Sequence, residues 1–279
     1  MSSTTSTATT NPNASFRSLS VESFKVMDVL RKANELQSLG HDVLHCEVGQ
    51  PETGAPVTVA QAAVSALNEP RVMGYTDAFG LIELRSKINQ HYMRYYPHKG
   101  SSNSGEDYGG GNHDHQDGPN PGIERIVVTT GSSGGFLLAF TSCFDVGDVV
   151  AIASSGYPCY RNILSALGCE LAIIEINEEF KLTAKELQQE IERRSNNQRG
   201  LKPIKGLILS SPSNPTGAML TPIELKELCE LCDSTNIQFI SDEIYHGISY
   251  GKEEATALQY SDKALVINSF SKYYSSKYS

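Results

Sequence analysis

The chain has 279 residues, of which 39% are hydrophobic, so it can bury the core of one large domain and is not disordered or fibrous as a whole. Its formal net charge is -9 and its basic residues are not clustered, which argues against nucleic acid or an anionic membrane as the main partner. No apolar run approaches the length of a membrane-spanning segment.

Two segments of low apolar content predict disorder. Residues 1–20 are rich in Ser and Thr, with Arg17 as their one basic side chain, which favours a disordered tail over a transit peptide. Residues 100–122 consist mainly of Ser, Gly, Asn, Asp and His and predict a disordered surface insertion. His113 and His115 within it could hold a metal, but no cysteine or structured carboxylate supports them, so we predict no metal site.

From residue 126 onward, apolar β-branched runs predict buried strands that alternate with amphipathic helices. The predicted strands are residues 126–129, 149–153, 171–174, 206–209, 238–241 and 265–267. This alternation implies an α/β fold, a mostly parallel sheet with helices on both faces, whose binding site lies at the carboxyl ends of the strands. Cys229 and Cys232, the one close pair among six cysteines, fall in a predicted helix; we interpret them as reduced packing residues, with metal or redox chemistry as the alternative.

Small and polar residues follow the first two strand ends that matter for function. Residues 126–129 run into Thr-Gly-Ser-Ser-Gly-Gly, where free N–H groups at a helix start and the hydroxyls of Ser132 and Ser133 offer an anion site. A flexible connector rich in Gly and Ser is the alternative interpretation of the same residues. Residues 206–209 run into Ser-Ser-Pro-Ser-Asn-Pro-Thr-Gly, which predicts a rigid turn that presents Asn214. A turn with a purely structural role is the alternative.

The last two strand ends add a carboxylate, a phenol and an amine. Asp242 and Tyr245 follow residues 238–241 about one helical turn apart, although a helix cap with a surface tyrosine is the alternative. Lys272 follows the final strand, where a lone lysine is normally a solvated charge. The order and spacing of SNPTG, SDEIYHG and NSFSKYY resemble the fold-type I pyridoxal 5'-phosphate (PLP) enzymes, in particular the class I/II aminotransferases, over about residues 24–275.

The resemblance implies roles for these residues. Lys272 would be the Schiff-base lysine and the base that moves the substrate α-proton, and Asp242 would keep the pyridine nitrogen protonated so that the ring accepts the carbanion's charge. Tyr245 and Asn214 would hydrogen-bond the ring oxygen. The phosphate would be bound by Ser132, Ser133 and Ser269.

Earlier segments resemble the same family. Residues 155–160 match the stretch whose aromatic side chain stacks on the cofactor, for which we prefer Tyr157 to Tyr160; an ordinary core tyrosine is the alternative. Residues 47–51 resemble the loop that passes the substrate carboxylate, which makes Gly49 a substrate-binding candidate with Asn214. Tyr75 resembles the tyrosine that reaches a neighbouring subunit's phosphate, so the resemblance implies a homodimer.

The implied organisation is a disordered tail at 1–20, the N-terminal part of a small domain at 21–56, and a PLP-binding large domain at 57–279. In the family the lysine is followed by a glycine, an aromatic residue and a phosphate-binding arginine, whereas here residues 273–279 read Tyr-Tyr-Ser-Ser-Lys-Tyr-Ser. The carboxylate-binding arginine is also missing. We therefore expect a chain truncated after Lys272, with low stability and activity.

The expected function is transfer of an amino group between an amino acid and a 2-oxo acid. A PLP-dependent lyase or an aminocyclopropane-carboxylate-synthase-like enzyme on the same fold is one alternative, and a non-catalytic PLP-binding fragment is another. We expect a cytoplasmic location, with import into an organelle left open.

Overall fold

The computed structural model describes residues 23–49, 54–70, 74–96, 119–196 and 200–274, together with Asn13, Ser15, Arg17 and Val21. The helices are α2 (Lys25–Ser38), α3 (Val57–Asn68), α4 (Ile82–Tyr95), α5 (Gly131–Cys143), α6 (Pro158–Leu167), α7 (Ala184–Ser195) and α8 (Pro222–Thr235), with 3-10 turns η1 (Ile123–Arg125) and η2 (Ala257–Gln259). The strands are β1 (Val149–Ala153), β2 (Glu170–Ile174), β3 (Ile204–Ser210), β4 (Gln238–Asp242) and β5 (Leu265–Ile267).

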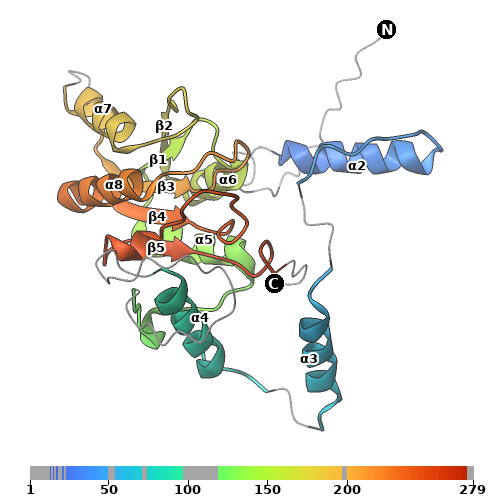
Figure 1. Cartoon of the computed structure of the whole chain (residues 1–279). Helices are drawn as coiled ribbons and strands as arrows, with labels where there is room; N and C mark the ends of the chain where they lie inside the picture. Colours follow the sequence, from blue (N-terminus) through green and yellow to red (C-terminus); the bar gives the residue numbers. More distant parts are fainter. Residues whose placement is uncertain are drawn as a thin grey trace.

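The five strands form one sheet in the order β2-β1-β3-β4-β5, and every pairing in it is parallel. All five residues of β1 are buried, as expected for a central strand covered on both faces. Helices α7 and α8 cover one face and α5 and α6 the other (Figure 1). The predicted α/β class with helices on both faces is confirmed.

Each face of the sheet has its own apolar core. On one face Leu187 of α7 and Leu228 of α8 pack against the strands, and on the other Phe140 of α5 and Leu164 of α6 do so. All four side chains are fully buried. Cys229 and Cys232 belong to the α8 core as free thiols. Burial raises the pKa of both, which agrees with a packing role.

Polar capping residues fix where α7 and α8, the two helices on one face of the sheet, begin. Thr183 and Glu186 form a capping box at the start of α7, and Thr221 and Glu224 form another at the start of α8. Each box satisfies two backbone groups that the first helical turn leaves unpaired.

The predicted strand at residues 126–129 is wrong. Ile126 has extended dihedral angles, φ -105° and ψ 124°, but the segment is not paired with any strand of the described sheet. The backbone N–H of Val128 donates instead to the carbonyl of Phe79 at 2.9 Å. An extended, β-branched sequence becomes a strand only where a neighbouring strand pairs with it.

Helices α2 and α3 lie apart from the sheet (Figure 1), and no residue of either is buried. One contact is the edge-to-face pair of Phe24 and Tyr157, whose ring centroids are 5.9 Å apart. The proposed division into residues 21–56 and 57–279 stays a prediction. The predicted tail, apart from Ser15, Arg17 and Asn13, and the predicted insertion up to residue 118, with His113 and His115, lie outside the described residues.

The described residues offer neither a membrane-spanning helix nor a metal-binding cluster. None of the helices there is long and apolar enough to cross a bilayer. The same residues contain no group of three or more His, Cys, Asp or Glu side chains arranged to hold a metal ion.

Gly206 gives a stability prediction, because β3 passes directly beneath the ring of Phe144. A β-carbon at position 206 would clash with the ring atoms Cζ and Cε1, and Phe144 is itself buried and cannot swing away. We expect Gly206→Ala to lower the free energy of unfolding by about 1–3 kcal/mol, measured by urea denaturation. Lys205→Ala, at the exposed neighbouring position of β3, is the control and should change it by less than about 0.5 kcal/mol. Equal stability of the two variants would contradict the steric argument.

Candidate active site

Three neighbouring strands bring the predicted site residues to one edge of the sheet. In the parallel register, Ser210 at the end of β3 lies beside Asp242 at the end of β4, and β5 ends beside Asp242 on its other side. The turns that follow these strands contain Asn214, Tyr245 and Lys272. This is the carboxyl edge, where parallel α/β sheets bind their ligands.

Asp242 is a buried carboxylate in a largely apolar setting. Its side chain is 1% exposed, and burial raises its pKa to about 6. Its Oδ2 accepts a short hydrogen bond from the hydroxyl of Tyr160, and its Oδ1 accepts one from the N–H of Ile244 at 3.2 Å. The bond to Ile244 caps a turn and not a helix, because residues 244–247 form a turn after β4. The contact with Tyr160 is additional.

Asn214, Tyr245 and Lys272 lie together. Nδ2 of Asn214 donates to Oη of Tyr245 at 3.0 Å, and Nζ of Lys272 lies 5.7 Å from the centroid of the Tyr245 ring. Burial raises the pKa of Tyr245, so its hydroxyl keeps its proton near neutral pH and can act as a donor. Lys272 is half-buried.

The start of α5 offers donors for an anion. The helix begins at Gly131 with φ +76°, and its N-cap residue, Thr130, makes no side-chain hydrogen bond to the first turn. The N–H of Gly131 already donates to the carbonyl of Thr129 at 2.8 Å. The candidate donors for an anion are therefore the following N–H groups of this turn and the hydroxyls of Ser132 and Ser133. Ser133 hydrogen-bonds the thiol of Cys159, which ties this turn to the start of α6.

Ser269 and Tyr157 are the remaining candidates for binding the cofactor. Ser269 lies in the loop after β5, and Tyr157 lies just before α6. A β-carbon at Gly135 would lie 3.4 Å from Ile267, so α5 packs closely on β5 just before Ser269. The hydroxyl of Ser269 accepts from the N–H of Ser271 at 3.1 Å. Tyr157 is half-buried and meets the Tyr160 ring edge-on, with centroids 5.6 Å apart. Its ring is therefore close to Asp242 through Tyr160.

The structure does not bring Gly49 and Tyr75 to this cluster. Gly49 is exposed, and Tyr75 is fully exposed. Gln50 and Pro51, which completed the resembling loop around Gly49, lie outside the described residues.

Sequence reasoning missed the contact between Tyr160 and Asp242. It weighed Tyr160 only as the second choice for stacking, yet Tyr160 is 2% exposed and its hydroxyl reaches the carboxylate. The useful pattern was the spacing of Tyr157 and Tyr160, three residues apart at the start of a helix, which places both side chains on the same side.

PLP has a phosphate, a basic ring nitrogen, a ring oxygen and an aldehyde, and the residues present fit each of them. Asp242 is the clearest case, since a buried carboxylate whose charge is disfavoured gains most from a cationic nitrogen. Tyr245 and Asn214 supply donors for an oxygen, and Lys272 supplies an amine for an aldehyde.

Comparison with known proteins agrees with this chemistry. The family model described as aminotransferase class I and II matches residues 41–277. The valine–pyruvate aminotransferase of Mycobacterium tuberculosis is 42% identical over 258 residues, covering 91% of this chain and 58% of that protein. The aspartate aminotransferase of Bacillus subtilis is 30% identical over 259 residues, covering 88% of this chain and 57% of that protein.

A solved structure gives the same result. The crystal structure of an aminotransferase from Mycobacterium tuberculosis superposes with a TM-score of 0.75 at 40% identity, covering 96% of this chain and 62% of that one. The chain thus spans about three fifths of the length of the relatives that it matches. On the match over residues 41–277, the chain belongs to the class I and II aminotransferase family.

Proposed function

We propose that this chain provides the PLP-binding site of an aminotransferase that exchanges an amino group between an amino acid and a 2-oxo acid. PLP is the cofactor of the family. The observation that supports the proposal most strongly is the convergence of Asp242, Tyr245, Asn214 and Lys272 on the carboxyl edge of one parallel sheet.

Each of these residues would have a distinct task. When bound, PLP supplies an electron sink for the charge left on the substrate α-carbon. The carboxylate of Asp242 would accept a hydrogen bond from the ring nitrogen, and Tyr160 and the Ile244 N–H hold that carboxylate in place. Tyr245 would donate to the ring oxygen, with its hydroxyl oriented by Asn214.

Lys272 would hold the cofactor between turnovers and afterwards move the α-proton. Its Nζ is the one amine among these four groups and lies 5.7 Å from the centroid of the Tyr245 ring, which supports this role. Ser132, Ser133 and Ser269 would bind the phosphate beside the first turn of α5. Tyr157 would stack on the cofactor ring.

A second copy of the chain is the proposed partner. Tyr75 is fully exposed, as a residue destined for a neighbouring subunit's phosphate would be in an isolated chain. Helix α3, just before it, exposes apolar side chains, namely Val57, Val64 and Leu67. Gly49 would contact the substrate carboxylate. A cytoplasmic location stays a prediction.

The proposed reaction is tested by a single half-reaction. We expect the PLP-loaded chain, mixed with L-valine or L-aspartate and no oxo acid, to release about one equivalent of 2-oxo acid per bound cofactor and then stop. Adding pyruvate should restore the starting absorbance spectrum. Continued release of a cleaved fragment would indicate a lyase instead, and retention of PLP without any oxo acid would indicate a non-catalytic fragment.

A further inference from the structure

A buried polar cluster lies behind the candidate site and takes no part in the proposed chemistry. It consists of Tyr96, Glu243, His246 and the backbone carbonyl of Ser211, and we call it the His246 cluster. The three side chains are 4%, 1% and 8% exposed. Polar groups buried this deeply are costly unless their hydrogen bonds are made, so their arrangement carries information.

The hydrogen bonds of His246 fix which ring nitrogen holds a proton. Nε2 lies 2.9 Å from the carbonyl oxygen of Ser211. A carbonyl only accepts, so Nε2 must carry hydrogen and donate. Nδ1 lies 2.8 Å from the hydroxyl of Tyr96, which can donate to it. Both ring nitrogens are therefore engaged, one with the loop after β3 and the other with the end of α4.

Glu243 supports the same ring from a second side. Its Oε1 accepts from the hydroxyl of Ser241 at 3.0 Å and from the N–H of Ala257 at 2.9 Å. Its Oε2 has no hydrogen-bond partner among the described residues and lies 3.6 Å from Nδ1 of His246. The carboxyl group therefore holds its own loop through Oε1, and its Oε2 faces the imidazole.

The place of His246 in the fold links it to the cofactor-binding groups. Ser211, which receives its hydrogen bond, begins the turn that presents Asn214, and His246 itself directly follows Tyr245. The backbone N–H of Ser211 also donates to the carbonyl oxygen of Asp242 at 3.2 Å. His246 thus joins the two turns whose side chains, Asn214 and Tyr245, must meet at 3.0 Å.

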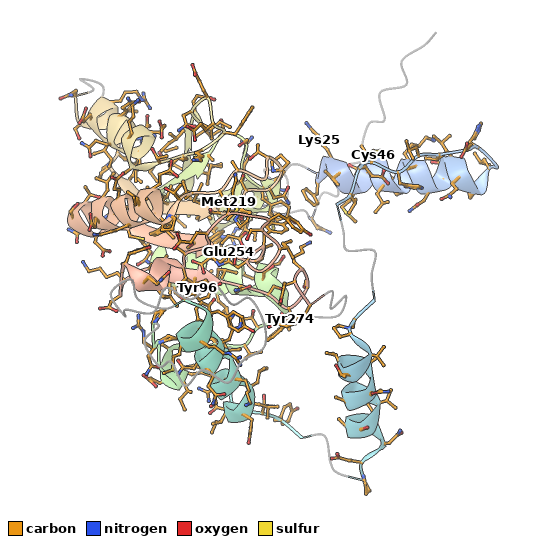
Figure 2. All side chains as sticks on the ribbon, in the orientation of Figure 1. Lys25, Cys46, Tyr96, Met219, Glu254 and Tyr274 are labelled. Atoms are coloured by element: carbon orange, nitrogen blue, oxygen red, sulfur yellow. The ribbon has the colours of Figure 1, made fainter. Side chains whose placement is uncertain are left out.

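Helix α4 braces this arrangement from 150 residues away in the sequence. Figure 2 labels Tyr96, just after the end of α4, beside the sheet. Tyr92, one turn earlier, stacks on Tyr96 with centroids 5.5 Å apart and accepts a hydrogen bond from Asn268 at 3.3 Å. Asn268 begins the loop that leads to Lys272. One helix end therefore contacts, directly or through His246, the loops after β3, β4 and β5.

We propose that His246 is a positioning residue that sets the Asn214–Tyr245 pair for the cofactor, acting through its Nε2–H bond to Ser211 and backed by Tyr96. The inference rests on the proposed function, because it concerns the same site. An ordinary core histidine would fill space here, whereas this one makes one directed bond to each of two separate segments. Its effect should therefore depend on which nitrogen is preserved.

Two matched substitutions separate the two bonds. The amide of Asn lies as many bonds from Cα as Nδ1 does, so His246→Asn keeps a partner for Tyr96 and loses the donor to Ser211. The amide nitrogen of Gln corresponds in the same way to Nε2, so His246→Gln keeps that donor. We expect His246→Asn to raise the dissociation constant for PLP about tenfold, which corresponds to the loss of one hydrogen bond. His246→Gln should stay within about twofold of the original chain. His41→Asn, at an exposed position, is the control for the substitution itself.

The measurements are PLP dissociation constants from absorbance titration and hydrogen exchange of the peptide spanning residues 211–220 in the cofactor-free chain. Faster exchange in His246→Asn than in His246→Gln, together with the loss of affinity, would support the proposal. Equal affinities and equal exchange in the two variants would overturn it. If His246→Asn fails to fold, Tyr96→Phe removes the other bond, the one to Nδ1 of His246, and unchanged affinity and exchange there would overturn the part assigned to Tyr96 and α4.

The exchange measurement needs no cofactor, which keeps the two hypotheses apart. Failure of the original chain to bind PLP would contradict the proposed function, while exchange of residues 211–220 would still decide whether His246 holds the turn.

Discussion

We expect Lys272→Ala to abolish covalent attachment of PLP and to lower amino-group transfer by at least about 10²–10⁴-fold, the usual contribution of a positioned general acid or base. The physical reason is that Lys272 is the one amine of the site, half-buried and 5.7 Å from the centroid of the Tyr245 ring. No neighbouring group among those described at this edge can both bind an aldehyde and accept the α-proton.

The measurement is borohydride reduction of the PLP-loaded chain followed by peptide mapping. The reduced pyridoxyl group should lie on the Lys272 peptide of the original chain and on no peptide of the variant. Lys263→Ala is the control, since Lys263 is exposed near β5 and should leave labelling unchanged. Labelling at Lys263, or at Lys277 outside the described residues, would show that the assignment of the lysine is wrong.

The sequence predicted the parts of the site that depend on local order along the chain. Asp242 ends β4, and Asn214, Tyr245 and Lys272 lie in the turns after β3, β4 and β5. Parallel pairing aligns these strand ends without further information. The register that places Ser210 beside Asp242 is a consequence of that pairing. Covalent order and one rule of sheet geometry were therefore enough to bring these residues to one edge, whereas their predicted roles rest on the family resemblance.

The misses all depend on contacts between distant segments. Residues 126–129 have strand-forming side chains, but a strand needs a partner, and the partner cannot be found from the segment itself. The role of His246 depends on Tyr96, and that of Tyr160 on Asp242 82 residues away. Gly49 and Tyr75 are exposed in the structure, and their proposed roles toward the substrate and a second subunit stay predictions.

Asp242→Asn is expected to act in opposite directions on stability and on cofactor binding. Burial raises the pKa of Asp242 from 3.8 to about 6, so the folded chain binds a proton that the unfolded chain has already released between these values. The stability of the cofactor-free chain therefore falls as the pH rises from about 4 to about 6, and above that range the buried charge costs about 3 kcal/mol. Asn removes the charge; its oxygen can still accept from the Ile244 N–H, and its Nδ2 can donate to the Tyr160 hydroxyl, which accepts as well as donates.

We therefore expect the cofactor-free Asp242→Asn chain to match the original at pH 4 and to exceed its free energy of unfolding by up to about 3 kcal/mol at pH 7.5, measured by urea denaturation. PLP binding at pH 7.5 should weaken about 10–150-fold, because a charge-assisted hydrogen bond of about 1.5–3 kcal/mol to the ring nitrogen is lost. A carboxylate present only for packing would give the stability change without the loss of binding, and an exposed carboxylate would give neither. A variant that is both more stable and a poorer PLP binder would show that the chain keeps a destabilising charge at this strand end for the sake of the cofactor, as functional sites commonly do.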